Sequence, residues 1–294
     1  MKLYAPSYYK KFKCIADKCE HSCCIGWEID IDEVTLKKYE KLKNGYAPAI
    51  KESISLKETP HFKLCEGDRC PHLDEAGLCK IISNVGEDYL CDICREHPRF
   101  YNFTSVCEVG IGMSCTEAAR IILSSPEYDS IEKIGKVDAI KTGASFDGRA
   151  ERGKLYSILK EHSEPYDKRL DEIRKSYLIP SREDIYYLKI IDSLEYLDES
   201  HKTLFMNYSS NCRPEGKDEY LERFLAYFIY RHTTESFDSE DFSARLSFCL
   251  FCERLFASLI CRTNAESLED LSTLARIISE EIEYSEDNTA SLTY

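Results

Sequence analysis

Residues 13–32 read KCIADKCEHSCCIGWEIDID, and this stretch holds four of the fifteen cysteines of the 294-residue chain. The only tryptophan, Trp27, follows them directly. Four thiols so close in sequence cannot all be core residues of regular helices or strands. The stretch is therefore expected to be a loop wrapped around a metal, at the head of the chain.

Further cysteines return in pairs, and together they give eight candidate metal ligands. The candidates are Cys14, Cys19, Cys23, Cys24, Cys70, Cys79, Cys91 and Cys94. One site would use four of these thiols and two sites could use all eight, because zinc and iron–sulfur clusters both take four thiolates. Neighbouring residues Cys23 and Cys24 cannot easily turn both side chains to one ion. The spacing rules alone favour zinc over iron, and the CxxxCxxC motif of radical iron–sulfur enzymes is broken because Gly26 occupies the third position.

Composition and cysteine use point to a soluble, reduced protein. Apolar residues make up 43% of the chain and charged residues 31%, as in ordinary globular proteins. The N-terminus, MKLYAPSYYKKFKC, has no apolar run of signal-peptide length, and no stretch approaches a membrane span. The cysteine count is odd, so at least one thiol stays unpaired. A cytoplasmic location with thiols that bind metal is favoured over a secreted disulfide framework.

The negative charge lies mostly in the second half of the chain. Residues 1–150 carry 21 Lys and Arg against 24 Asp and Glu, whereas residues 151–294 carry 18 against 29. An acidic body repels phosphate backbones and anionic membranes, so no nucleic-acid or membrane partner is expected. It would attract a lysine-bearing protein surface, although a solvated helical exterior is the simpler explanation of any particular charge.

The sequence pattern predicts a mainly α fold in which a cysteine-rich head with little strand precedes an all-α helical body. We expect a helix over 32–43 capped by Asp32, a thiol-aiming loop over 65–81, and a helix over 87–97 that presents Cys91 and Cys94 on one face. A single short strand is expected over 100–111, and a helix begins at Ser114 with Glu117 as its capping-box partner. The predicted domains are a metal module (1–125), a linker (126–150) and a helical domain (151–294).

Apolar residues repeat at helical spacing through most of 151–294. Three cysteines, Cys249, Cys252 and Cys261, lie in or beside an apolar run there and are expected to be small core residues. No internal repeat is present.

Four segments resemble, in this order and spacing, the flagellin lysine N-methylase (FliB-like) family and its eight-cysteine zinc- or iron-chelating (YkgJ-like) module. They are FKCIADKCEHSCCIGWEIDID (12–32), CPHLDEAGLC (70–79), GEDYLCDICREHPRF (86–100) and MSCTEAAR (113–120). The resemblance is strongest over residues 1–125.

The resemblance implies a cytoplasmic enzyme that uses S-adenosylmethionine to N-methylate lysine side chains on flagellin, with a [4Fe–4S] cluster in the module and zinc as the alternative. The residues themselves do not supply the methyl-donor site, because no strand–GxGxG–helix signature is present. A non-enzymatic iron- or zinc-binding module with a helical protein-interaction domain is therefore the alternative. A third, weaker alternative is a redox dithiol at Cys91 and Cys94.

A polar group after the second thiol pair is a candidate cofactor-binding site. Arg95, His97 and Arg99 could bind the carboxylate of the methyl donor or hydrogen-bond cluster sulfurs. Trp27, near the first thiols, could line the pocket. Simple helix capping, surface solvation and packing explain these residues equally well.

Lysine methylation requires a neutral amine, whose ordinary pKa is about 10.4, so the enzyme must desolvate it or provide a base. No catalytic residue stands out. Tyrosines could stabilise the cationic sulfonium, with Tyr101, Tyr227 and Tyr230 as candidates. His21 and His72 lie close enough in sequence to the thiols to replace a cysteine ligand.

Overall fold

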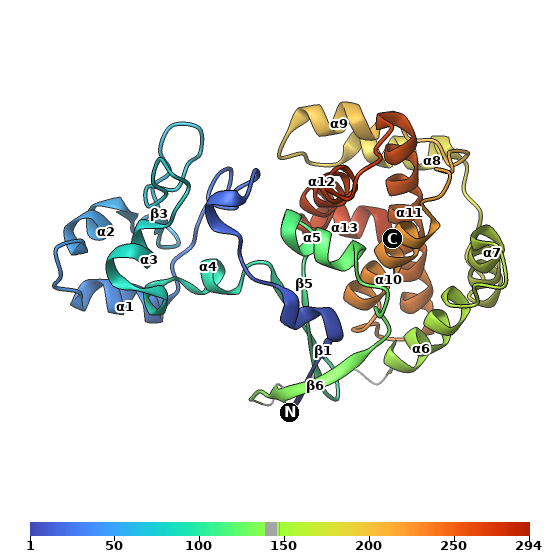
Figure 1. Ribbon diagram of the computed structural model, residues 1–294, viewed down its shortest axis with the longest axis horizontal. Helices are drawn as coiled ribbons and strands as arrows, with labels where there is room; N and C mark the ends of the chain where they lie inside the picture. Colours follow the sequence, from blue (N-terminus) through green and yellow to red (C-terminus); the bar gives the residue numbers. More distant parts are fainter. Residues whose placement is uncertain (139–145, 147) are drawn as a thin grey trace. The chain divides into compact units, whose positions relative to one another are not determined.

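The structure, a computed structural model, describes residues 1–138, 146 and 148–294 and divides into two compact units. Unit 1 comprises Met1–Phe12 and Arg99–Tyr294, and unit 2 comprises Lys13–Pro98. Helices predominate, which confirms the mainly α prediction (Figure 1). Unit 1 also contains a small mixed sheet that the sequence pattern did not predict.

Unit 2 is built from short helices joined by turns and one two-stranded sheet. Its elements are η2 (Ala16–Lys18), α1 (Glu33–Lys41), α2 (Ala47–Ser53), β2 (Ile54–Ser55), β3 (His61–Phe62), α3 (Lys80–Val85), η3 (Glu87–Tyr89) and α4 (Asp92–Glu96). Residues 65–79, predicted as a loop, form turns and isolated β-bridges, and α3 begins at Lys80. The small core of this unit gathers apolar residues such as Ile31, Tyr39, Ile50 and Phe62 around cysteine side chains.

Helix α1 follows the sequence prediction closely. It spans Glu33–Lys41, and Asp32 Oδ1 accepts a hydrogen bond from the backbone N–H of Thr35 at 2.8 Å. The second oxygen, Asp32 Oδ2, accepts from the backbone N–H of Asp92 at 2.9 Å. One carboxylate therefore satisfies the first turns of two helices, α1 and α4, that are distant in sequence.

The single helix predicted over 87–97 is wrong. The segment is a 3₁₀ turn, η3, followed by Leu90 and Cys91 in extended conformation and then by the one-turn helix α4. The break has a physical reason: the hydrogen bond between Asp32 and Asp92 makes Cys91 the N-cap residue of a new helix.

Unit 1 contains a four-stranded mixed sheet in the order β4-β5-β1-β6. The strands are β1 (Lys2–Pro6), β4 (Arg99–Phe103), β5 (Cys107–Ile111) and β6 (Ile131–Lys136). Strand β1 pairs parallel with β5 and antiparallel with β6, and β4 and β5 form an antiparallel hairpin. The single strand predicted over 100–111 is therefore a hairpin, and Cys107 at the start of its second strand is buried.

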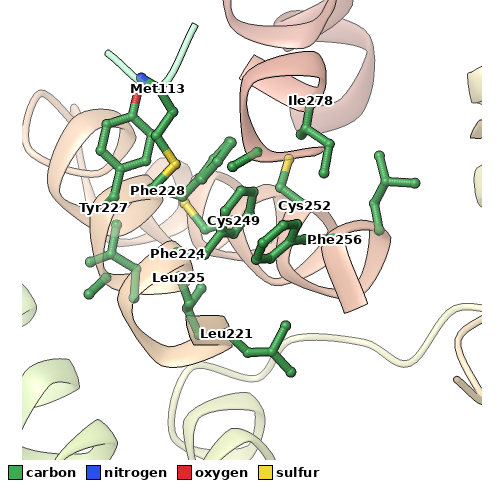
Figure 2. Close-up of a cluster of buried hydrophobic side chains, with 14 of the residues drawn as sticks. Met113, Leu221, Phe224, Leu225, Tyr227, Phe228, Cys249, Cys252, Phe256 and Ile278 are labelled. Atoms are coloured by element: carbon green, nitrogen blue, oxygen red, sulfur yellow. Dashed lines mark hydrogen bonds between the residues drawn. The ribbon is translucent and has the colours of Figure 1, made fainter. Parts of the chain in front are cut away.

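Helices make up the remainder of unit 1. They are η1 (Ser7–Lys11), α5 (Thr116–Leu123), α6 (Gly148–Leu159), α7 (Tyr166–Ser176), α8 (Asp184–Ser193), α9 (Glu199–Phe205), α10 (Asp218–His232), α11 (Ser239–Thr263), α12 (Leu268–Ile278), the π-helix η4 (Ser279–Glu283) and α13 (Glu286–Thr293). The hydrophobic core lies largely between α10, α11 and α12, where stacked Phe224 and Phe256 pack beside Cys249 and Cys252 (Figure 2). Both cysteines are fully buried, as predicted, whereas Cys261 is half-buried.

The capping box predicted at Ser114 is wrong. Cys115 is the N-cap residue of α5 and makes no side-chain cap. The Ser114 hydroxyl donates instead to the hydroxyl of Tyr284 at 2.9 Å, and Glu117 pairs with Arg120 one turn later. Ser114 therefore bonds to a residue distant in sequence, and Glu117 pairs with a residue one turn along the helix, rather than with each other.

The predicted domain boundaries at 125 and 150 both fall inside unit 1. The predicted linker contains strand β6, and its residues 139–145 and 147 lie outside the described residues.

Candidate functional site

Five of the eight predicted metal-binding cysteines gather around the core of unit 2. Two hairpin-like turns and the start of α4 carry these cysteines. The backbone N–H of Cys70 donates to the carbonyl of Cys24 at 2.8 Å, and Cys79 forms a β-bridge with Leu73. Cys91 and Cys94 face each other with their sulfurs 3.5 Å apart. We call this set the thiol cluster; it consists of Cys24, Cys70, Cys79, Cys91 and Cys94.

Burial and the charges of neighbouring thiols shift the pKa values of this cluster. Burial raises the pKa of Cys70 to about 12, and the charges of Cys24, Cys79 and Cys91 add to this effect. Burial also raises the pKa of Cys79, although backbone N–H groups at the start of α3 oppose it. Without a counter-charge, so many buried thiols cannot all ionise together.

Two members of the cluster are held closer to the thiolate form. A hydrogen bond with Cys23 lowers the pKa of Cys24 to about 6, with the nearby Arg69 contributing in the same direction. A hydrogen bond with Cys94 lowers the pKa of Cys91, and the same contact together with burial raises the pKa of Cys94. Of the two, Cys91 is therefore the one that ionises more readily. A bound cation would supply the counter-charge that deprotonates the remaining thiols.

Aromatic residues that the sequence prediction missed lie against the thiol cluster. Tyr39 is fully buried and donates its hydroxyl proton to the carbonyl of Tyr89 at 2.6 Å. Burial first, and then the charges of Cys91, Cys94 and Cys79, raise its pKa. Tyr46 is likewise affected by Cys79 and Cys70.

His72, which follows Cys70 in unit 2, has a hydrogen-bond partner at each ring nitrogen. Its Nδ1 lies 2.9 Å from the hydroxyl of Tyr46 and its Nε2 lies 2.9 Å from that of Ser53. Burial, followed by the charge of Lys80, lowers its pKa to about 4. Both ring nitrogens of His72 are thus occupied by hydroxyl groups, and the hypothesis that it replaces a cysteine ligand stays a prediction.

The remaining predicted ligands lie nearer the surface of unit 2. Cys14 and Cys23 are exposed, and the Cys19 sulfur contacts the carbonyl of His21 at 3.0 Å. Cys65, which the sequence prediction left out, is also exposed and pairs through its backbone with Arg69. Within the residues that the structure describes, no three His, Cys, Asp or Glu side chains are arranged to hold one metal ion.

The predicted cofactor-binding residues fall in both units. In unit 2, Arg95 donates to the carbonyl of Leu90 at 3.1 Å and pairs with Asp92, while Trp27 is half-buried. In unit 1, the guanidinium of Arg99 donates to the hydroxyl of Tyr9 at 3.0 Å. Each arginine thus serves local structure, and the predicted role of Arg95, His97, Arg99 and Trp27 in cofactor binding stays a prediction.

Unit 1 contains a second cluster of ionisable groups, centred on the fully buried side chain of Glu283 in the π-helix η4. Glu283 accepts hydrogen bonds from the hydroxyl of Tyr227 at 2.9 Å, from Nε2 of His232 at 2.6 Å and from Ser279, and pairs with Arg231 at 3.2 Å. The sequence had suggested Tyr227 as a sulfonium-stabilising residue. Its hydroxyl donates to Glu283 and accepts from the backbone N–H of Met113, and its suggested role beside the sulfonium stays a prediction. This cluster is a satisfied structural network.

Comparison with known proteins finds similarity to a flagellar biosynthetic protein and to two lysine-N-methylases. No family model matches the sequence, and no solved structure matches it. Three curated proteins do match. The flagellar biosynthetic protein FliU of Salmonella muenchen is 28% identical over 161 residues, which is 52% of this chain and 94% of that protein.

The other two relatives are named lysine-N-methylase and come from Salmonella typhimurium and Salmonella choleraesuis. Each is 28% identical over 130 residues, and the match covers 42% of this chain but only 32% of the relative. The chain thus matches about a third of the length of these methylases.

Among the residues described, no helix has the length and apolar character needed to cross a membrane.

Proposed function

We propose that the chain is a protein-lysine N-methyltransferase that transfers the methyl group of S-adenosylmethionine to lysine side chains of flagellin in the cytoplasm. The single observation that carries this proposal is the similarity to two lysine-N-methylases together with a flagellar biosynthetic protein. The flagellar name of the first relative supports flagellin as the substrate. The acidic surface of residues 151–294 is compatible with a lysine-bearing protein partner.

In such a reaction the neutral amine of the substrate lysine attacks the methyl carbon of the sulfonium, the carbon–sulfur bond breaks, and S-adenosylhomocysteine leaves. The amine must lose a proton, because its ordinary pKa is about 10.4. Tyrosine and carboxylate groups of this chain that face the bound amine would have to desolvate it or accept that proton.

We further propose that the thiol cluster of unit 2 holds an iron–sulfur cluster, with zinc as the alternative. Five thiols gather in one small core, one more than the four that either group requires, although no three of the described side chains are arranged around a single ion. Four of Cys24, Cys70, Cys79, Cys91 and Cys94 would be the ligands. The group would supply either electron transfer or the folding energy of a unit whose apolar core is small.

The activity is tested by incubating anaerobically purified protein with flagellin and S-adenosylmethionine that carries a labelled methyl group. We expect label on flagellin lysines, located by peptide mass spectrometry, and stoichiometric release of S-adenosylhomocysteine. Flagellin whose surface lysines have been chemically acetylated is the matched control and should take up no label. Absence of label on native flagellin contradicts the proposed activity.

The metal proposal has a separate test. Metal analysis and the visible absorption spectrum should show about four iron and four sulfide per chain for a [4Fe–4S] cluster, or zinc without colour. We expect Cys70→Ser and Cys91→Ser to lose most of the metal, whereas the exposed Cys65→Ser should retain it. Equal metal content in all three variants contradicts the assignment.

A non-enzymatic metal-binding module is the second candidate. It is favoured by one observation: the match covers only 32% of each lysine-N-methylase. The two functions differ in ligand-induced stabilisation, since only a methyltransferase gains melting temperature from S-adenosylmethionine or S-adenosylhomocysteine.

A further inference from the structure

Four buried polar atoms of unit 1 belong to side chains that meet at Tyr166, the first residue of α7. They are the hydroxyl oxygen of Tyr166, Nε of Arg169, Nε of Arg213 and Oε2 of Glu253. Across residues 1–138, 146 and 148–294, no protein group forms a hydrogen bond with any of the four. A buried polar atom without a partner is costly, so native proteins nearly always satisfy such atoms with protein groups or with ordered water.

Contacts between the side chains show that these atoms belong to one place in the fold. The guanidinium carbon of Arg169 lies 5.0 Å from the centre of the Tyr166 ring, and that of Arg213 lies 5.2 Å from it. Nη1 of Arg213 donates in turn to Oε1 of Glu253, on α11, at 2.9 Å. Tyr166, Arg169 and Glu253 are each more than nine-tenths buried. The four atoms therefore form one polar site where α7, the connection before α10, and α11 meet.

The four atoms include both donors and an acceptor, which restricts the ligand that they can bind. Burial, followed by the charge of Glu253, raises the pKa of Tyr166 well above its ordinary value, so its hydroxyl keeps a proton to donate. The Nε–H groups of Arg169 and Arg213 also donate, whereas Oε2 of the Glu253 carboxylate accepts. This oxygen lies 4.0 Å from Nε of Arg254, which is too far for a direct bond but within the span of a bridging water.

The balance of charge at the site argues against an ion. Three guanidinium groups pair there with three carboxylates: Arg169, Arg213 and Arg254 with Asp167, Glu222 and Glu253. A chloride ion could not donate to Glu253, and a metal cation could not accept from Tyr166 or from the arginines. Water is neutral, donates and accepts, and typically makes about three hydrogen bonds when it is buried in a protein.

We propose that this site binds internal water, which bridges the first turn of α7 to α11. One water accepts hydrogen bonds from the Tyr166 hydroxyl and from Nε of Arg213, and donates to Oε2 of Glu253. Because a water molecule accepts two hydrogen bonds, the remaining donor, Nε of Arg169, binds a second water. All four buried atoms are then satisfied without movement of the existing ion pairs.

A high-resolution crystal structure of the full chain tests the proposal. We expect density for a water about 2.7–3.2 Å from the Tyr166 hydroxyl and from Oε2 of Glu253. Tyr166→Phe removes one donor and should lower the occupancy of this water. Tyr156→Phe is the matched control and should leave the water in place, because the buried Tyr156 hydroxyl donates directly to the carbonyl of Ala226 at 2.9 Å.

Three crystallographic results overturn the proposal. In the first, the four atoms pair directly with one another. In the second, they stay unpaired and no density lies between them. In the third, the density has the anomalous signal of a chloride or metal ion.

A second measurement on the wild-type chain needs neither crystals nor a variant that folds. X-ray irradiation produces hydroxyl radicals from bound as well as bulk water, so a buried side chain that touches internal water becomes modified. Peptide mass spectrometry should find Tyr166 modified and Tyr156, which is also buried, unmodified. Modification of neither tyrosine, or of both equally, contradicts the proposed site.

Discussion

At the scale of single residues, the structure depends most on carboxylates that lie inside the protein with several partners. Glu283 illustrates this. Its fully buried side chain receives hydrogen bonds from Tyr227 and His232 and pairs with Arg231. Burial alone would raise the pKa of Glu283, but Arg231 and His232 lower it below its ordinary value.

We predict that Glu283→Gln destabilises the protein by about 3–5 kcal/mol at neutral pH, because Arg231 is left buried without its counter-charge. The carboxylate pKa is lowered in the folded state, so its contribution is present above the unfolded value of about 4.3 and is lost as pH falls through the folded pKa. The difference between wild type and variant in urea-unfolding free energy should therefore shrink below about pH 4. The exposed Glu286→Gln is the control, and a pH-independent difference contradicts the prediction.

At the scale of elements, a glycine in the β4–β5 hairpin is required by close packing. A Cβ at Gly110 would lie 2.3 Å from the ring of Phe100, which itself packs edge-on against Tyr227 and Tyr230 and cannot move away freely. At Gly135 in the edge strand β6 nothing lies within 4 Å of the same position.

We predict that Gly110→Ala destabilises the protein by about 1–3 kcal/mol through overpacking, whereas Gly135→Ala changes stability by less than about 1 kcal/mol. Chemical denaturation of the two variants measures both values. Equal effects at the two positions would mean that the Phe100 ring relocates at no cost.

A second prediction at this scale concerns the carboxylate that caps two helices. Burial raises the pKa of Asp32, but hydrogen bonds from the backbone N–H groups of Thr35 and Asp92 outweigh it, so the net pKa is lowered. Asp32→Ala removes both caps and should cost about 2 kcal/mol, about 1 for each helix. Asp32→Asn keeps an oxygen for Thr35 but presents an amide group to Asp92, so about half the loss is expected.

Hydrogen exchange separates these outcomes. The Asp92 amide should lose protection in both variants and the Thr35 amide only in Asp32→Ala, with the exposed Asp30→Ala as control. Unchanged protection of Asp92 in Asp32→Asn would show that the second cap contributes nothing to α4.

The same residues show how far sequence reasoning extends. The helix after Asp32 was predictable because cap and helix are adjacent. The break at Cys91 was not, because its cause is Asp32, sixty residues earlier in the chain. Ser114 and Glu117 have the spacing of a capping box, yet the partner that takes Ser114 is Tyr284. Five of the predicted ligands were found together because paired cysteines are a strong signal. The sequence pattern marks Tyr39 only as an apolar position on a helix. Its place against the thiols depends on tertiary packing.

At the scale of the whole molecule, the division into units follows long-range pairing rather than sequence order. Strand β1 lies between β5 and β6, so the first residues of the chain belong to the unit that contains its last. No local pattern in residues 1–12 predicts this, since the partners Cys107 and Lys136 lie more than a hundred residues away. The cysteine-rich segment is consequently an insertion, Lys13–Pro98, between two parts of one unit.

This organisation predicts two thermal transitions with different sensitivity to metal. The core of unit 2 is small and includes thiols, whereas unit 1 has a large apolar core in which Cys249 and Cys252 behave as hydrophobic residues. A metal bound only by the folded thiol cluster stabilises unit 2 by about 4 kcal/mol at a thousand times its Kd and leaves unit 1 unchanged. Calorimetry of the full chain before and after chelation should therefore move one transition alone.

The pH dependence of the metal-induced rise in melting temperature tests the metal site of unit 2 most directly. Burial raises the pKa of Cys70 to about 12 in the metal-free protein, so metal binding must displace its proton. The metal-dependent rise in melting temperature should accordingly shrink as pH falls, because protons compete with the metal for the thiols. Cys65→Ser should retain the shift and Cys70→Ser should lose it. If chelation moves both transitions equally, or neither, the thiol cluster is not a metal site that stabilises unit 2.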